Sequence, residues 1–209
     1  MIAGGMDNMS MNRKEEIVLI TLELAAQKGL ANVSMSMIAD KIGIKKPSLY
    51  KHFASKEEIV EAMYEYLRRQ AKEKANIKPI DYSTFFAGKT VYEILQSVVR
   101  GYIQMNHQEK MLNFYKVIYS ERSLNPMAAK IVTEETDKMI IATKQLFYAM
   151  EVHKLLHFTN PDMSAVSFAM TIHGLMDYEL DQSNGKCCYE TDKNLLDDYL
   201  KWFCEENAV

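Results

Sequence analysis

Residues 37–56 read Met-Ile-Ala-Asp-Lys-Ile-Gly-Ile-Lys-Lys-Pro-Ser-Leu-Tyr-Lys-His-Phe-Ala-Ser-Lys, and the fold of the chain depends on this stretch. Gly43 lies where two short helices would meet, because glycine adopts a positive φ at little energetic cost. Leu49 and Phe53 lie four positions apart, which predicts the buried stripe of the second helix. The pattern therefore predicts a helix-turn-helix whose second helix covers residues 45–53.

The charge of the same stretch indicates what the second helix faces. Residues 41–56 carry one histidine, no acidic residue and five lysines: Lys41, Lys45, Lys46, Lys51 and Lys56. A basic cluster of one sign on a helix-turn-helix is typical of proteins that bind the phosphate backbone of DNA. For a charge run alone, an ordinary lysine-rich surface is the favoured alternative. The turn geometry reverses that preference and favours a DNA recognition helix.

Residues 38–58 resemble the DNA-binding signature of the TetR family of bacterial transcriptional regulators. The core of the resemblance is Leu-Tyr-x-His-Phe-x-Ser-Lys at residues 49–56, a pattern rarely met elsewhere. Lys45 departs from the family pattern, because the position that opens the recognition helix is often a serine, which would cap the helix. The resemblance implies an all-α protein. Its N-terminal three-helix helix-turn-helix DNA-binding domain would be followed by a helical-bundle ligand-binding and dimerisation domain.

The composition of the whole chain agrees with a helical globular protein. The 209 residues are 48% hydrophobic and 25% charged, with only four prolines and eight glycines. No apolar run approaches the roughly 20 residues needed to span a bilayer, and no signal peptide is recognisable. We therefore expect a cytoplasmic protein without a membrane partner. The three cysteines (Cys187, Cys188 and Cys204) then carry reduced thiols, and an oxidant-sensing role for the adjacent pair is the less favoured alternative.

The helical signals divide the chain into three parts. Residues 1–11 predict a disordered leader, residues 12–75 a helix-turn-helix domain with a connecting fourth helix, and residues 76–209 a helical ligand-binding and dimerisation domain. The net charge of −3 is unevenly distributed. Basic residues outnumber acidic ones by 12 to 9 in residues 12–75, whereas acidic residues lead by 18 to 13 in residues 76–209. The basic surplus therefore lies in the part that predicts DNA binding.

Capping signals locate the helices of the first domain. Asn12 predicts the start of the first helix and Gly29 its end. Ser34 caps the second helix. Ser55 and Glu58 form a capping box that opens a long fourth helix.

The second domain begins after a connection at residues 76–89. Its helices are expected at about residues 91–102, 111–123, 127–154 and 162–181, with a last helix capped by Thr191. Asn125-Pro126 and Asn160-Pro161 repeat one device, an asparagine cap with proline at the first helical position.

The resemblance also implies a division of labour among the DNA-binding residues. The major groove would be read by Lys46, Pro47, Ser48 and Lys51, while phosphates would be held by Tyr50, His52 and Lys56. Lys45 would contact a phosphate or a base. Two structural alternatives stay open, since the ring of Tyr50 could pack into the domain core and His52 could cap a helix end.

Aromatic and methionine side chains in the second domain predict a small-molecule pocket. The residues expected to line it are Tyr102, Met105, Phe114, Ile118, Phe147, Phe168 and His173. Any helical core contains such residues, so the pocket rests mainly on the family resemblance.

Enzyme signatures are missing from the sequence. There is no nucleophile elbow, nucleotide-binding glycine motif, His-Glu-x-x-His or Cys-x-x-Cys, so we expect no catalytic residues, no metal and no cofactor. His153 and His157 could share a metal on one helix face, but a role at the helix end is the favoured interpretation.

The sequence therefore predicts a homodimeric repressor that a small molecule releases from a palindromic double-stranded DNA operator. The residues expected to form the dimer interface are Phe168, Ile172, Leu175, Leu196, Leu200 and Phe203. Two alternatives stay open: a constitutive helix-turn-helix protein without a ligand switch and, less favoured, a helical-bundle enzyme.

Overall fold

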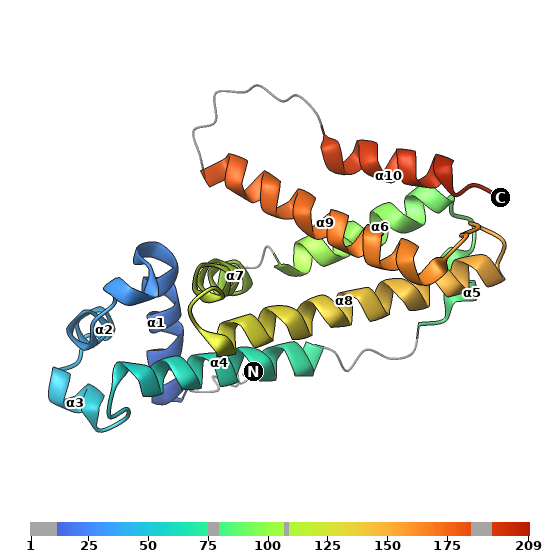
Figure 1. The fold of residues 1–209 in the computed structure, drawn as a ribbon. Coiled ribbons are helices and arrows are strands. Elements are labelled where there is room, and N and C mark those ends of the chain that lie inside the picture. The colour runs from blue at the N-terminus through green and yellow to red at the C-terminus, as the bar shows by residue number, and fades with distance from the viewer. Residues whose placement is uncertain (1–11, 75–79, 107–108, 185–193) are drawn as a thin grey trace, which may run out of the picture. The chain divides into compact units, whose positions relative to one another are not determined.

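The computed structural model describes residues 12–74, 80–106, 109–184 and 194–209, and every regular element within these ranges is helical (Figure 1). The all-α prediction is thereby confirmed. The chain forms two compact units. The first comprises residues 1–76 and 109–132, and the second comprises residues 77–108 and 133–209.

In the first unit, helices from both chain segments pack against α1. Its elements are α1 (Arg13–Lys28), η1 (Leu30–Asn32), α2 (Met35–Ile42), α3 (Lys46–Tyr50), α4 (Lys56–Lys74), α7 (Glu109–Glu121) and the first residues of α8 (Pro126–Val152). Helices α2, α4 and α7 all contact α1. The sequence division assigned α7 to the second domain, but its buried side chains share a core with α1 and α4.

The structure confirms the predicted N-caps of α1 and α2. Asn12 Oδ1 accepts a hydrogen bond from the backbone N–H of Lys14 at 3.1 Å, and Ser34 Oγ accepts one from Met37 at 3.3 Å. Gly43 ends α2 in the left-handed conformation, with φ 77°. Most side chains avoid this conformation, so the sharp turn between α2 and α3 depends on glycine.

The recognition helix is shorter than the predicted range of residues 45–53. Helix α3 ends at Tyr50, and the chain then tightens, with Lys51 N–H donating to the Ser48 carbonyl and His52 N–H to the Leu49 carbonyl. Hydrogen bonds of this i to i+3 kind close a narrower turn than an α-helix does.

The second unit contains α5 (Tyr82–Phe86), α6 (Val91–Asn106), the remainder of α8, α9 (Pro161–Asn184) and α10 (Leu195–Glu206). Helix α5 was not predicted, because residues 76–89 were interpreted as a connection. Asp81 Oδ1 caps α5 by accepting from the N–H groups of Ser83 and Thr84. A hydrogen bond from the Thr84 hydroxyl, followed by these backbone hydrogen bonds, lowers the pKa of Asp81. The helix buries Phe86.

Two other helix ends differ from the prediction. Asn194 caps α10 by accepting from the N–H of Asp197 at 3.2 Å, whereas Thr191, the predicted cap, lies outside the described residues. Helix α8 ends at Val152, and Lys154 follows with φ 55°. The predicted caps Asn125 and Asn160 are confirmed, since each accepts a backbone hydrogen bond.

Closely packed aromatic rings form the core of the second unit. Phe147 lies 4.6 Å from Phe158 between ring centroids, and Phe168 lies 4.8 Å from Phe203. The predicted dimer interface is therefore wrong for four of its residues, which are at most 5% exposed within their own subunit: Phe168, Ile172, Leu200 and Phe203. The apolar stripes of α9 and α10 are buried against neighbours in the same chain, so other faces of these helices remain for a partner.

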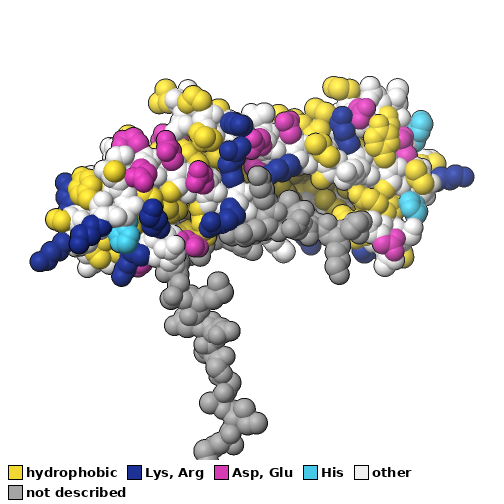
Figure 2. Space-filling view, turned by 90° about the horizontal axis from the view of Figure 1, so that it is seen from below, with side chains coloured by type: hydrophobic (Ala, Val, Ile, Leu, Met, Phe, Trp, Pro, Cys, Tyr) yellow, Lys and Arg dark blue, Asp and Glu magenta, His cyan; other side chains and the backbone are white. Residues whose placement is uncertain are grey.

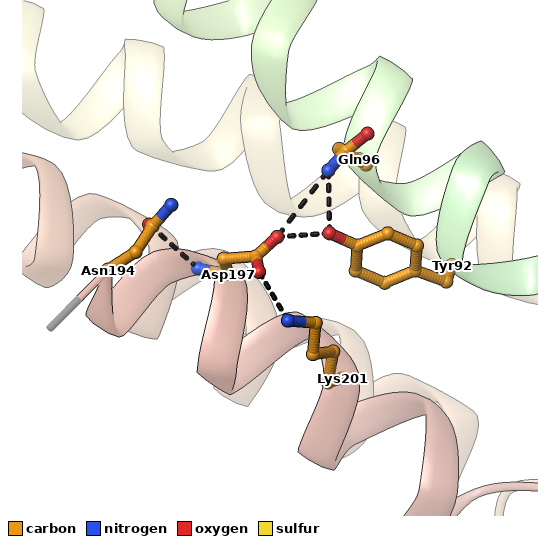
Figure 3. A network of polar contacts seen from close by, with 5 residues as sticks. All are labelled: Tyr92, Gln96, Asn194, Asp197 and Lys201. Carbon is orange, nitrogen blue, oxygen red and sulfur yellow. Dashed lines mark hydrogen bonds and ion pairs between the residues drawn. The ribbon is translucent and has the colours of Figure 1, made fainter.

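A polar network joins α6 to the start of α10 (Figure 3). The Tyr92 hydroxyl donates to Asp197 Oδ1, and Gln96 Nε2 donates to the Tyr92 oxygen at 2.6 Å. Lys201 Nζ lies 2.7 Å from Asp197 Oδ2. Hydrogen bonds from Lys201 and then Tyr92 lower the pKa of Asp197, which favours its charged carboxylate form.

Within the described ranges, every helix is too short or too polar to span a lipid bilayer.

Candidate nucleic-acid interface

The helix-turn-helix rests on the buried residues that the sequence predicted. Leu49 is fully buried and Phe53 is 3% exposed, and both share a core with Ile59 and Met63 of α4. Helix α3 has only five residues, too few for a stable isolated helix, so its position depends on this packing.

The predicted DNA-binding side chains lie on α3 and on the residues that flank it. Lys45, Lys46, Pro47, Tyr50 and Lys51 are exposed, and Ser48 and His52 are half-buried. Tyr50 is 45% exposed, which is evidence against the alternative that its ring packs into the core. Lys46 Nζ lies 6.0 Å from the centroid of this ring. In Figure 2, Lys and Arg side chains project from the end of the first unit formed by α2 and α3.

The five-lysine cluster divides into two groups. Lys41 Nζ pairs with Glu23 Oε1 of α1 at 3.1 Å, and Lys56 Nζ donates to the Leu30 carbonyl oxygen at 3.0 Å. For the side-chain amines of Lys45, Lys46 and Lys51, no ion pair or hydrogen bond is recorded among the described residues. The outward positive charge therefore comes from three lysines around α3, while two lysines fix the motif to its own scaffold.

Two carboxylates, Glu57 and Glu58, lie in the first turn of α4. Glu58 Oε2 accepts the N–H of Ala54 at 2.5 Å, and the N–H of Glu58 donates to Ser55 Oγ at 3.2 Å. The predicted capping box is thus present, with Ala54 rather than Ser55 donating to the glutamate. A backbone hydrogen bond and then the Ser55 hydroxyl lower the pKa of Glu57, which favours its charged form at the positive end of the helix.

The residues predicted to line a ligand pocket are divided between the two units. Phe114 and Ile118 belong to the core of the first unit, and Phe147 and Phe168 to the core of the second. The side chain of Met105 lies outside the described residues. The structure therefore does not gather the predicted lining in one core.

Tyr102 and His173 are the two predicted lining residues that contact each other through polar atoms. The Tyr102 hydroxyl lies 2.7 Å from His173 Nε2, and the ring centroids are 5.7 Å apart. Burial lowers the pKa of His173, and the charge of Asp177 partly opposes that shift. Asp177 was missed by sequence reasoning, although its position four residues after His173 on one helix is the signal that could have identified it.

No group of three potential metal ligands occurs among the described residues. His153 and His157 lie beyond the end of α8, so they do not share a helix face, as the less favoured metal alternative required. His157 Nδ1 instead lies 3.9 Å from Glu151 Oε1. Cys204 is half-buried, and burial raises its thiol pKa to about 11, which disfavours the reactive thiolate. Cys187 and Cys188 lie outside the described residues.

Comparisons with known proteins agree on one family. Residues 17–63 match the family described as bacterial regulatory proteins, tetR family. The biofilm operon icaADBC HTH-type negative transcriptional regulator IcaR of Staphylococcus aureus (strain Newman) is 30% identical over 136 residues, which cover 60% of this chain and 73% of IcaR.

Solved structures share the fold over nearly the whole chain. A protein from Mesorhizobium loti MAFF303099 assigned to the TetR family aligns with a TM-score of 0.64 and 19% identity, covering 97% of this chain and all of that one. A protein from Saccharomonospora viridis, solved in complex with choline, aligns with a TM-score of 0.61 and 18% identity, covering 92% and 93% of the two chains. With the sequence match to IcaR and the exposed basic face of α3, these findings show that the chain belongs to the TetR family of bacterial transcriptional regulators.

Proposed function

We propose that this protein is a homodimeric transcriptional repressor that leaves a palindromic operator when a small molecule binds. The observation that carries the proposal is the two-sided helix α3. Its buried face fixes it to α4, and on its outer side it presents Lys46 and the exposed Tyr50, with Lys45 and Lys51 exposed at its two ends. The match to IcaR, a negative transcriptional regulator, supports repression as the direction of control.

For DNA recognition, α3 would enter the major groove. Lys46, Pro47, Ser48 and Lys51 would contact base edges, and lysine can donate to the acceptors of guanine. Tyr50, His52 and Lys45 would contact the backbone and fix the register. One such helix contacts few base pairs, so two copies related by a two-fold axis are needed for a specific operator.

The dimer surface that we propose is the outer face of α9 together with Trp202 of α10. Met163, Met170 and Tyr178 are spaced at helical intervals on α9 and are 59%, 52% and 44% exposed. Trp202 is 53% exposed, in ring contact with Tyr199. Large apolar side chains exposed in one stripe favour a protein partner, and a two-fold contact would cover the same stripe in both subunits.

For the effector, we propose that the Tyr102–His173 pair supplies the polar end of a site in the second unit. Both side chains are partly buried, and their polar atoms already meet at 2.7 Å. Asp177 adds negative charge on the same helix. The choline complex of the Saccharomonospora viridis protein supports a small-molecule site in proteins of this fold. An enzyme function is not supported, because the family consists of transcriptional regulators.

The repressor proposal is tested with an operator selected in vitro from a random duplex pool. Lys46→Ala should weaken binding to the selected operator by about 1–3 kcal/mol and relax the sequence preference at one position. Lys41→Ala is the matched control, because the Lys41 ammonium is paired with Glu23 and should not read bases. Selection that yields no enriched sequence, or equal effects of the two substitutions, would contradict the proposed readout.

The ligand switch is tested on the same operator complex. A compound that raises the melting temperature of the free protein should also release DNA. The coupling free energy between compound binding and operator binding should amount to roughly 1–3 kcal/mol. Compounds that bind and leave operator affinity unchanged would favour a constitutive repressor instead.

A further inference from the structure

A single side chain joins the two ends of the helix-turn-helix. Leu30 begins η1, the turn before α2, and Lys56 is the first residue of α4, just after α3. Lys56 Nζ donates to the Leu30 carbonyl oxygen at 3.0 Å across 26 positions in the sequence, in a partly buried setting. The hydrogen bond therefore closes a loop that contains α2, the Gly43 turn and α3.

The two helices inside this loop depend on such an anchoring contact for their stability. Helices α2 and α3 have eight and five residues, and short helices derive their stability from packing and anchoring rather than from their own hydrogen bonds. An ammonium that donates to a carbonyl makes a charge-assisted hydrogen bond, stronger than a neutral one. Leu30 is itself 7% exposed, so the acceptor belongs to the core of the unit rather than to a loose surface loop.

Lys56 also differs from the lysines around α3. Lys45, Lys46 and Lys51 are exposed, whereas Lys56 is half-buried and its ammonium is directed to the chain's own backbone. The sequence predicted that Lys56 holds a DNA phosphate. A lysine that neutralises a phosphate steepens the salt dependence of binding, whereas a lysine that only fixes the protein's shape does not.

We infer that Lys56 is a positioning residue, which holds α3 for DNA by tying the start of α4 to the turn before α2. This inference rests on the proposed DNA-binding function and refines it. It predicts that residue 56 acts through the N–H that it donates within the protein and not by neutralising a DNA phosphate.

The experiment compares Lys56→Met, which removes the donor, with Lys56→Gln, which keeps an N–H donor without the charge. Lys45→Met is the matched control, because Lys45 is exposed and is proposed to contact the DNA backbone. For each full-length variant, fluorescence anisotropy with a random-sequence duplex between about 50 and 200 mM KCl gives the affinity and the salt slope. Thermal unfolding of the free protein gives the melting temperature.

We expect Lys56→Met to lower the melting temperature and to weaken DNA binding about three- to tenfold with an unchanged salt slope. Lys56→Gln should restore part of both losses, because its shorter side chain donates a neutral hydrogen bond, and it should leave the salt slope unchanged. Lys45→Met should keep the melting temperature and reduce the slope by about 0.9, the value of one phosphate contact. If Lys56→Met and Lys56→Gln both reduce the slope by this amount without a change in melting temperature, Lys56 holds a phosphate and the inference is overturned.

Failure of the underlying function would look different. If the unsubstituted protein binds no duplex at any salt concentration, the proposed function is wrong. In that case the melting temperatures alone still test whether Lys56 ties the start of α4 to the turn before α2. A lower melting temperature in Lys56→Met that Lys56→Gln raises again in part supports this role, and equal melting temperatures for all three proteins overturn it.

Discussion

The hydroxyl oxygen of Tyr102 lies 2.7 Å from Nε2 of His173, and this contact joins α6 to α9 within the second unit. Burial holds the pKa of His173 below its ordinary value of 6.5. A histidine with a lowered pKa is more readily protonated in the unfolded chain than in the folded one. Its contribution to stability is therefore complete above about pH 6.5 and is lost as the pH falls below that value.

We predict that the melting temperature of the protein falls between pH 7 and pH 5, and that His173→Gln reduces this fall, because glutamine does not titrate. Tyr102→Phe should lower the free energy of unfolding by about 1 kcal/mol at pH 7.5 through loss of the hydrogen bond. Thermal and urea unfolding measure both effects. His157→Gln serves as the control, since that imidazole is 78% exposed. The same pH profile in His173→Gln and the unsubstituted protein would contradict the prediction.

A second prediction concerns Tyr64, which is 2% exposed in the core of the first unit. Its hydroxyl has no hydrogen-bond partner among the described residues, and burial followed by the charge of Glu121 raises its pKa to about 12. Removing an unsatisfied buried hydroxyl removes its desolvation cost. Tyr64→Phe should therefore raise the free energy of unfolding by about 1 kcal/mol. Urea titration measures the change.

The control for Tyr64→Phe is Tyr50→Phe, because Tyr50 is 45% exposed and its hydroxyl is hydrated in the folded protein. A decrease in stability on Tyr64→Phe would mean that the hydroxyl is hydrogen-bonded in solution.

The network around Asp197 gives a third prediction. Asp197→Asn removes the charge that holds Lys201, and we expect the melting temperature at pH 7 to fall by about 2–4 °C. Hydrogen bonds lower the pKa of Asp197 from 3.8, so its stabilising effect is present above that pH and is lost as the pH falls further. The difference between the two proteins should therefore shrink below about pH 3.8. Asp198→Asn, an exposed neighbour on α10, should change neither quantity.

The proposed dimer surface gives a fourth prediction. Met170→Glu places one negative charge per subunit at the centre of the outer α9 stripe, where a two-fold contact would bring both charges together. We expect sedimentation to show a monomer at concentrations at which the unsubstituted protein is a dimer, together with the loss of operator binding. Met127→Glu is the control, because Met127 is an exposed methionine of the first unit. A stable dimer of Met170→Glu would contradict the proposed surface.

The sequence was most informative where function and structure depend on neighbours in the chain. The Gly43 turn, the Ser34 and Asn12 caps and the buried pair Leu49 and Phe53 all follow from residues at most four positions apart. The five-lysine cluster was also recognisable from the sequence. Its division into three outward-facing lysines and two lysines that contact the protein itself was not. Lys56 reaches a carbonyl 26 positions away, and no local pattern encodes that contact.

Long-range packing also explains the errors in the second unit. The apolar stripes of α9 and α10 were correctly recognised, but periodicity cannot tell whether a stripe meets its own chain or a partner. Phe168 and Phe203 meet each other, so the predicted interface became an internal core. The predicted pocket was divided for the same reason, since Phe114 follows α7 into the first unit.

Because the apolar stripes of α9 and α10 are buried within one subunit, operator binding would depend on protein concentration in a particular way. A subunit whose apolar interior is already satisfied does not need a partner in order to fold, so pairing becomes a separate equilibrium governed by mass action. At low expression, occupancy of a two-half-site operator would then rise more steeply than in proportion to the amount of protein. Silencing would set in over a narrow range of protein level, without any small molecule.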